Sequence, residues 1–369
     1  MPFWAIYLQA QGYSPAQIGD LMALLAATKL ISPNLWGWLA DRTDRSMLLV
    51  RLSSVLTALS FAFFGQVTSY AWMILFTLLV GFFWNAPLPL FEAVTVSYLH
   101  QDAHGYSRIR VWGSIGFIVA VLALGHALDS FLLIDCLPPL ILMLFIVMAV
   151  VTLLVPERSV QAYEGVASSL WRILRQFKVL AFFLVVMLVQ ISHGAYYVFF
   201  SIHLKDNGYD ASQTGMLWAL GVFAEILLFL VFRHVLRRFS LRRIMLVSVG
   251  MGVVRWLLIG WCVNSIPQLV FAQILHAVTF GAHHVVAIQL VHKYFAGPHH
   301  GKGQSLYSSM SYGLGGMLGS WYSGRLWAEW GAEVVYTLAA AASLLALFVV
   351  WAGVERGPNL SVAISSRRA

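Results

Sequence analysis

The sequence predicts an all-α membrane protein made of two six-helix bundles related by pseudo-twofold symmetry. Of its 369 residues, 60% are hydrophobic and 10% are charged, whereas a soluble domain has about 25% charged residues. Apolar stretches of about 20 residues, the length that a membrane-spanning helix needs, recur along the whole chain. A sequence repeat relates the first half of the chain to the second, which indicates two similar bundles.

Twelve apolar segments are predicted as helices, six on each side of one long polar connector. The first segment is about half the length of a membrane span, so we expect that the start of this helix is truncated. The chain then divides into an N-terminal bundle (1–155), a cytoplasmic linker (156–178), a C-terminal bundle (179–355) and a cytoplasmic tail (356–369). The predicted helices are 1–10, 17–39, 47–65, 71–98, 107–127, 131–155, 179–204, 212–232, 243–263, 268–293, 304–326 and 334–354.

The repeat is clearest where the second helix of each half begins. Segments 12–19 and 208–215 both start with Gly-Tyr and end with Gln-x-Gly. Parallel repeats of this kind build transporters whose site lies between the two halves. The alternative is that similar loop chemistry arose by convergence at two helix starts.

Lysine and arginine lie mainly in alternate loops, which is the positive-inside pattern of membrane proteins. The formal charge of +8 would indicate nucleic acid as a partner of a soluble protein. Here the distribution instead places the basic loops and the C-terminus in the cytoplasm. We therefore expect a multi-pass protein of the inner (plasma) membrane that contacts the lipid bilayer, binds no nucleic acid and is a monomer.

Three ionisable residues lie inside predicted helices of the second half: Glu225, Arg255 and His276. A carboxylate inside a membrane is costly unless it is paired or protonated, and an imidazole titrates near neutral pH. If the contact between Glu225 and Arg255 changes, the acid can take up or release a proton, which His276 would orient or relay. These residues predict proton-linked transport, with the proton as the coupling ion and no cofactor. For His276 the alternative is a neutral core histidine.

The loop between the second and third predicted helices resembles a signature of the major facilitator superfamily. It carries Gly37, Asp41, Arg42 and Arg45 at the signature positions, whereas Asp44 stands where glycine is usual. The resemblance implies the major facilitator fold. For the four matching residues it implies a charge clasp that gates the cytoplasmic side.

The fourth and fifth predicted helices resemble those of the lactose-permease-like branch of this superfamily. Glu92 and Arg110 fall on its sugar-binding acid and arginine, and Ser114 and Phe117 fall where it has a cysteine and a sugar-stacking tryptophan. Arg110, Ser114 and Phe117 share one helical face, which offers a cation, a hydroxyl and an aromatic plane to a small amphipathic molecule. The alternative for Glu92 and Arg110 is an ion pair that only fixes packing.

In the second half, the resemblance places Glu225, Arg255 and His276 on the proton-relay positions of that branch. Thr279 stands where the permease has a further carboxylate. Together with Phe117 in place of tryptophan, this departure argues against a sugar as the substrate.

Over nearly its whole length the chain resembles the phenylpropionate permease group. The resemblance implies that His193, Tyr196 and Tyr197 contribute to the substrate site. The stretches that carry it are 192–197, 217–225, 252–256 and 273–276.

The charges expected inside the membrane leave one cation without an acid. The acidic residues are Glu92 and Glu225, and the basic residues are Lys29, Arg110 and Arg255. An anionic ligand best satisfies a surplus buried cation, so we expect a carboxylate substrate that Lys29 helps to bind. The alternative is that Lys29 extends to the membrane interface.

We therefore expect a proton-coupled symporter of a small organic solute, with an aromatic carboxylate such as 3-phenylpropionate as first choice. The alternatives are a nucleoside or oligosaccharide proton symporter and a proton-antiport efflux carrier. A non-transporting receptor is a further possibility. The chain lacks the serine elbow and zinc motifs of hydrolases, so we expect no enzyme. His283 and His284 do not complete a metal site with His276, so we expect no metal; the role of the two is left open.

Overall fold

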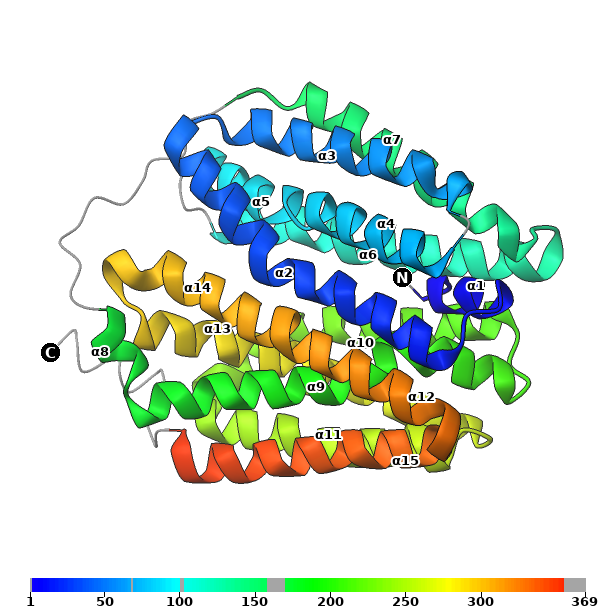
Figure 1. The fold of residues 1–369 in the computed structure, drawn as a ribbon. Coiled ribbons are helices and arrows are strands. Elements are labelled where there is room, and N and C mark those ends of the chain that lie inside the picture. The colour runs from blue at the N-terminus through cyan, green and yellow to red at the C-terminus, as the bar shows by residue number, and fades with distance from the viewer. Residues whose placement is uncertain (1, 68, 100–102, 158–169, 355–369) are drawn as a thin grey trace, which may run out of the picture.

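The computed structural model describes residues 2–67, 69–99, 103–157 and 170–354. These residues are almost entirely helical and form two bundles that lie side by side (Figure 1). Nine helical segments of this described part are long and apolar enough to cross a membrane, and the predicted all-α membrane fold is confirmed.

The N-terminal bundle contains α1 (Trp4–Ala10), α2 (Pro15–Thr43), α3 (Ser46–Ala62), α4 (Tyr70–Trp84), α5 (Pro87–Tyr98), α6 (Ala103–Ser130) and α7 (Leu137–Leu154). After the short α8 (Leu170–Leu174), the C-terminal bundle contains α9 (Phe177–Asp206), α10 (Ala211–Arg238), α11 (Leu241–Trp261), α12 (Ile266–His276), α13 (His283–Tyr294), α14 (His300–Ser308) and α15 (Gly316–Gly353).

Several predicted helices are broken or joined in the structure. The segment predicted as 71–98 is two helices, because Pro87 has no backbone N–H and begins α5. Two π-helical segments, Ala277–Ala282 and Ser309–Gly315, join α12 to α13 and α14 to α15. The label α15 covers the last part of the helix that begins with α14 and the whole of the next helix, and the two meet at Gly331, whose φ of +75° lies outside the helical range.

The two halves begin their second helices with the same structure. Gly12 and Gly208 both have a φ of +84°, which glycine adopts without strain. Ser14 and Asp210 then start α2 and α10. The side chain of each capping residue accepts a hydrogen bond from the backbone N–H of the glutamine three residues later, Gln17 or Gln213. The side chain of that glutamine accepts a hydrogen bond from the backbone N–H of the capping residue. The repeated sequence positions thus produce the same turn and cap in both bundles.

The predicted linker 156–178 contains α8. Residues 158–169 of the linker and the tail 356–369 lie outside the described residues, so the division of the chain at the linker stays a prediction.

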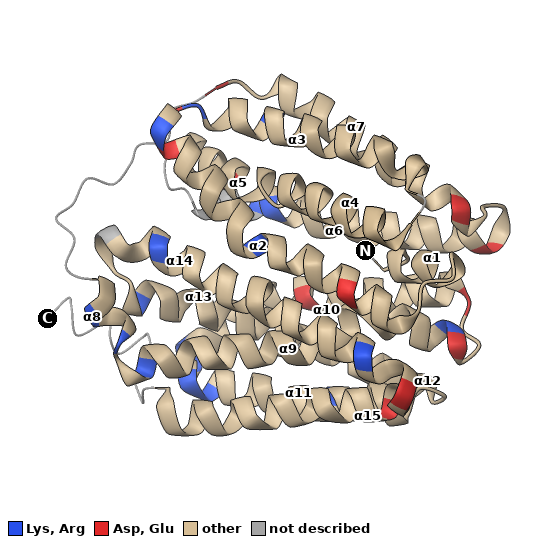
Figure 2. Ribbon diagram, in the orientation of Figure 1, with Lys and Arg blue, Asp and Glu red and all other residues tan. Residues whose placement is uncertain are grey.

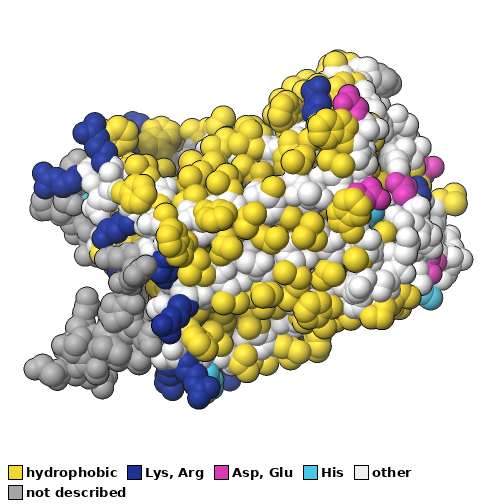
Figure 3. All heavy atoms as spheres, turned by 90° about the horizontal axis from the view of Figure 1, so that it is seen from below, with side chains coloured by type: hydrophobic (Ala, Val, Ile, Leu, Met, Phe, Trp, Pro, Cys, Tyr) yellow, Lys and Arg dark blue, Asp and Glu magenta, His cyan; other side chains and the backbone are white. Residues whose placement is uncertain are grey.

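Basic and acidic residues concentrate toward opposite ends of the bundles (Figure 2). Between these ends, hydrophobic side chains cover most of the face shown in Figure 3. The basic end is the one where α2 and α10 end and α11 and α14 begin, beside α8; these segments carry Arg42, Arg172, Arg237, Arg238, Arg242 and Lys302 there. The acidic end is the one where α6 and α9 end, α7 and α10 begin and α15 turns at Gly331; these segments carry Asp129, Asp135, Asp206, Asp210, Glu329 and Glu333 there.

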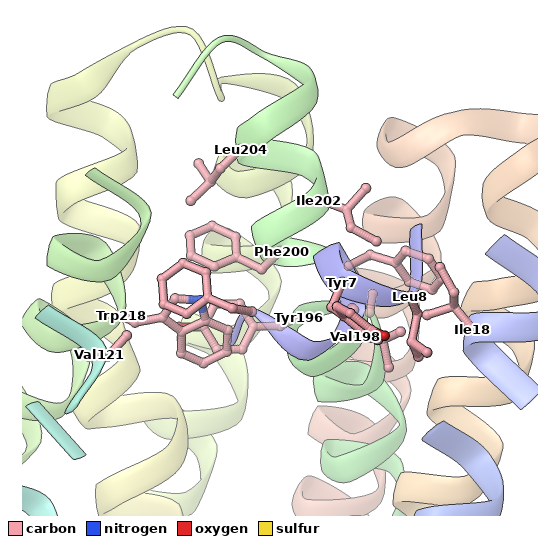
Figure 4. Packing of buried hydrophobic residues seen from close by; sticks show 14 of the residues in the cluster. Tyr7, Leu8, Ile18, Val121, Tyr196, Val198, Phe200, Ile202, Leu204 and Trp218 are labelled. Atoms are coloured by element: carbon pink, nitrogen blue, oxygen red, sulfur yellow. The ribbon is translucent and has the colours of Figure 1, made fainter. Parts of the chain in front are cut away.

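Toward the acidic end, the two bundles share one hydrophobic core. Figure 4 shows Tyr7, Leu8 and Ile18 of the N-terminal bundle beside Val198 and Ile202 of α9. Toward the basic end the buried hydrophobic residues form two separate clusters. One is drawn only from residues 36–94 and the other only from residues 179–354.

Two helix crossings bring the backbones of the bundles into contact near the acidic end. A Cβ added to Gly19 of α2 would lie 2.6 Å from the Cα of Gly324 in α15. A Cβ added to Gly215 of α10 would lie 2.6 Å from the carbonyl oxygen of Val121 in α6. Small residues allow this close approach of helices.

Polar contacts reinforce the same end. Asp129 at the end of α6 accepts the N–H groups of Ala211 and Ser212 at 2.9 and 2.6 Å, at the start of α10. Arg325 of α15 lies 3.1 Å from Asp20 of α2. The bundles are therefore joined at the acidic end, whereas their cores separate toward the basic end.

Candidate functional site

Glu225 lies where α10 meets the helix that runs from α12 to α13. Its Oε2 is 3.5 Å from Nε2 of His276, and the two side chains are 16% and 7% exposed. Gly281 makes room for the acid, because a Cβ there would lie 2.9 Å from Cγ of Glu225. Gly221 packs against His276, where an added Cβ would be in van der Waals contact at 3.4 Å. The structure thus brings the acid and the imidazole together in a notch between two glycines.

Arg255 is fully buried beside this pair. Its Nη1 donates to Thr279 Oγ1 at 3.1 Å, and its Nε donates to a backbone carbonyl of α12 at 3.1 Å. The guanidinium also lies 4.4 Å from the ring of Tyr196 and 4.6 Å from that of Trp256. The structure does not pair Arg255 with Glu225: Nη1 and Nε bind a hydroxyl and a carbonyl, and two aromatic faces lie beside the guanidinium. Its buried Nη2 has no hydrogen-bond partner among the described residues.

The expected residues of the N-terminal bundle lie on α5 and α6. Nε of Arg110 is 3.7 Å from Oε1 of Glu92, and their side chains are 57% and 39% exposed. Ser114 and Phe117 are partly buried on the same face of α6. Phe117 meets Trp218 of α10 edge to face, with ring centroids 6.5 Å apart. This contact joins the predicted substrate face of one bundle to the other bundle.

The three expected residues of α9 differ in position. His193 is buried, donates to the backbone carbonyl of Val189 through Nδ1, and meets Trp256 edge to face at 4.7 Å. Tyr196 is also buried. Tyr197 is only partly buried, and its ring centroid lies 6.4 Å from that of Phe280. Of the three, Tyr197 is therefore the most exposed.

Lys29 of α2 approaches the C-terminal bundle through an aromatic ring. Its Nζ lies 5.9 Å from the ring centroid of Tyr312. The hydroxyls of Tyr312 and Tyr307 lie 3.2 and 2.9 Å from Nδ1 of His284. The sequence left the role of His284 open. Only the π-helical segment before it, which has no clear sequence signal, brings it to the same side as His276.

The expected gating residues lie at the basic end of α2 and in the turn that follows. Asp41, Arg42 and Arg45 are exposed, and Gly37 is partly buried. The guanidinium of Arg42 lies 5.4 Å over a tryptophan ring of its own helix. Asp44 has a φ of +53°, a left-handed conformation that explains why glycine is usual at this position.

No group of three or more histidine, cysteine, aspartate or glutamate residues in the described ranges could hold a metal ion.

The model of the MFS_1 like family matches residues 1–338. The chain belongs to this family. It is therefore a transporter of the major facilitator superfamily and not an enzyme, and the predicted family is confirmed.

Among curated relatives, the chain is 28% identical over 302 residues to the "Probable 3-phenylpropionic acid transporter" of Escherichia coli (strain K12), covering 79% of this chain and 77% of the relative. It is 24% identical over 345 residues to the "Nucleoside permease NupG" of Escherichia coli (strain K12), covering 85% and 80%. A crystal structure of the nucleoside transporter NupG has a TM-score of 0.82 at 19% identity, covering 96% of this chain and 95% of the other. The structural likeness shows the shared fold.

Proposed function

We propose that the protein is a proton-coupled symporter that imports a small aromatic carboxylate. The observation that carries the proposal is the meeting of aromatic rings, cations and a buried acid where the two bundles face each other. A relative described as a probable 3-phenylpropionic acid transporter supports the same substrate class.

Aromatic rings from both bundles supply the apolar part of the site. Phe117 lies 6.5 Å from Trp218, and Trp218 lies 6.4 Å from Tyr197 in a nearly parallel arrangement. Phe280 adds a further ring 6.4 Å from Tyr197. Aromatic side chains bind a planar ring through stacked and edge-to-face contacts, so this group fits a phenyl substituent.

Two cations of the N-terminal bundle supply the polar part. Glu92 lies near Arg110, whereas the ammonium of Lys29 lies 5.9 Å from the ring centroid of Tyr312. A carboxylate substrate would complete the charge balance at Lys29 and accept hydrogen bonds from it.

The basic end lies in the cytoplasm by the positive-inside rule, and with it the C-terminus. We take this conformation as open to the inside, because the shared core and the two close helix crossings lie toward the acidic end. Nearer the basic end, α2 still contacts the other bundle where Nδ2 of Asn34 donates to Oγ of Ser309 at 3.3 Å. Arg110 supports this interpretation: it is 57% exposed, although Val121 on the same face of α6 is buried against α10. Transport would proceed by rocking of the two bundles around the central site, within a monomer in the inner (plasma) membrane.

Proton coupling would run through Glu225. In the present conformation its partner is His276 and not Arg255. A carboxyl in this setting exchanges between a protonated and an ionised form as its partners change. Binding of a solute, or the rocking movement, would alter those partners and so link proton uptake to solute movement.

Uptake into energised right-side-out membrane vesicles tests the proposal. Labelled 3-phenylpropionate, uridine and maltose are compared with and without a protonophore. We expect accumulation of 3-phenylpropionate that the protonophore abolishes. Accumulation of uridine instead would favour a nucleoside symporter, in keeping with the nucleoside permease among the relatives. Protonophore-sensitive uptake only into everted vesicles would favour efflux.

A further inference from the structure

Three rings stack along the helix that runs from α12 to α13. The ring centroids of His276 and Phe280 lie 5.2 Å apart with an angle of 10° between their planes. Those of Phe280 and His284 lie 6.3 Å apart with an angle of 7°. In a straight α-helix, residues spaced by four drift by about 40° per step. The wider turn of the π-helical segment Ala277–Ala282 removes much of this drift and places both histidines on one face.

His284 is held by two tyrosines of the neighbouring helix. Its Nδ1 lies 2.9 Å from the hydroxyl of Tyr307 and 3.2 Å from that of Tyr312. A tyrosine hydroxyl can donate or accept a hydrogen bond. The two hydroxyls therefore suit a neutral imidazole, whose Nδ1 accepts, and a protonated one, whose Nδ1 donates. This orientation leaves Nε2 as the atom of the ring that can exchange a proton.

Charged and titratable groups from several helices face His284. Glu225 of α10 and Arg110 of α6 both interact electrostatically with His284. Glu225 also interacts electrostatically with Arg110. Lys29 of α2 lies over the ring of one of the two tyrosines. On its own helix, His283 is buried. Glu225 thus shares its surroundings with His284 and with the basic side chains of Arg110 and Lys29. The charge of Glu225 and that of His284 therefore depend on each other.

Glu225 sits between the two histidines along the helix. Its oxygen lies 3.5 Å from His276, and its Cγ packs against Gly281, three residues before His284. Because the helix runs from the acidic to the basic end, His284 lies about 12 Å nearer to the basic end than His276 at 1.5 Å per residue. The acid can thus face one histidine on the side of the acidic end and another on the side of the basic end.

We infer that His284 is a second proton-accepting residue of the coupling site, which takes the proton of Glu225 toward the basic end. The O–H bond of the Glu225 carboxyl breaks and an N–H bond forms at Nε2 of His284, which leaves a carboxylate and an imidazolium. The imidazolium then returns the proton from Nε2 to water on the cytoplasmic side. This inference rests on the proposed proton coupling through Glu225, but not on the identity of the solute.

Infrared spectroscopy of the purified full chain tests the inference without a solute. The band of the protonated Glu225 carboxyl is identified by its absence in Glu225→Gln, and its amplitude is followed against pH. In His284→Gln we expect the midpoint of this titration to shift by about one pH unit or more, as for the loss of a neighbouring charge. The matched control is His234→Gln, which should leave the midpoint unchanged. His234 is an exposed histidine of α10, the helix that carries Glu225.

A second variant guards against loss of the fold. The double variant Tyr307→Phe, Tyr312→Phe keeps His284 but removes the hydroxyls that orient it, and it should also shift the midpoint. Thermal unfolding and gel filtration show which variants are folded. A Glu225 midpoint that is the same in the folded His284→Gln protein, or in the folded double variant, as in the wild type overturns the inference.

Transport assays separate this inference from the proposed function. If the wild type accumulates a solute, His284→Gln should lower protonophore-sensitive accumulation at least about tenfold while exchange of that solute across the membrane persists. Equal loss of both overturns a role in proton transfer. If none of the probes is accumulated, the proposed function fails, whereas the infrared titration still decides whether His284 and Glu225 share a proton.

Discussion

Replacement of Gly19 by alanine tests how the two bundles meet at the acidic end. The added Cβ would lie 2.6 Å from the Cα of Gly324 and 2.8 Å from the carbonyl oxygen of Ser320. Carbon atoms pack at about 3.5–4.0 Å, so α2 and α15 would have to separate by roughly 1 Å. Both neighbours are backbone atoms, so no rotation of a side chain can relieve the contact.

The strain from Gly19→Ala acts only in conformations in which the acidic ends touch. Overpacking costs typically about 1–3 kcal/mol, and a free-energy difference of that size changes a conformational equilibrium by about 5–150-fold. We therefore expect the variant to populate conformations that are separated at the acidic end much more than the wild type does.

Spin labels at the acidic end measure this change. After replacement of Cys136 and Cys262 by serine, cysteines at the exposed positions Gln66 and Asn264 carry one label on each bundle. Electron–electron double resonance should show a longer-distance population that grows in the Gly19→Ala protein.

The matched control is Gly116→Ala, because a Cβ at Gly116 of α6 would meet no heavy atom within 4 Å. It should reproduce the wild-type distances. If Gly19→Ala also reproduces them, the crossing does not hold the acidic end closed and the reasoning is refuted.

Three further substitutions probe the site and the closure. Gly281→Ala should displace Glu225, whose Cγ lies 2.9 Å from the new Cβ position, and lower the initial rate of proton-driven uptake about tenfold. Gly250→Ala is the control and should leave the uptake rate unchanged, because a Cβ at Gly250 would lie 3.9 Å from its nearest neighbour. Equal uptake rates in the two variants would contradict the close packing of Glu225 against Gly281. Asp129→Asn weakens two hydrogen bonds between the bundles and should favour separation of the acidic ends by about 1 kcal/mol, visible with the same spin labels; an unchanged distribution would argue against a clasp. Lys29→Gln should raise the KM for an anionic solute about tenfold, since hydrogen bonds to charged groups contribute about 1.5–3 kcal/mol, and an unchanged KM would place Lys29 outside the site.

The sequence predicted the helices well, because their determinants are local. Apolar length defines a span, and the capping residues Ser14 and Asp210 mark where α2 and α10 begin. The contact of Glu92 with Arg110 also follows from their similar depth on adjacent antiparallel helices. The sequence did not show that Pro87 divides one predicted helix into α4 and α5, since proline is tolerated inside many membrane helices.

The detail of the second half depends on tertiary structure. The π-helical segment that aligns His284 with His276 arises from packing and has no sequence pattern of its own. Arg255 binds Thr279 and two aromatic faces, and this choice among several nearby acceptors cannot be read from its depth in the membrane. Sequence therefore located the ionisable groups, and the structure decided which of them meet.

The most direct test of proton coupling through Glu225 is Glu225→Gln in membrane vesicles. The amide is close to the carboxyl in size but cannot release a proton. Accumulation driven by a proton gradient should therefore vanish, while exchange of labelled for unlabelled solute should continue at a rate near that of the wild type. Normal accumulation by the variant, or loss of accumulation and exchange to the same degree, would contradict a coupling role for Glu225.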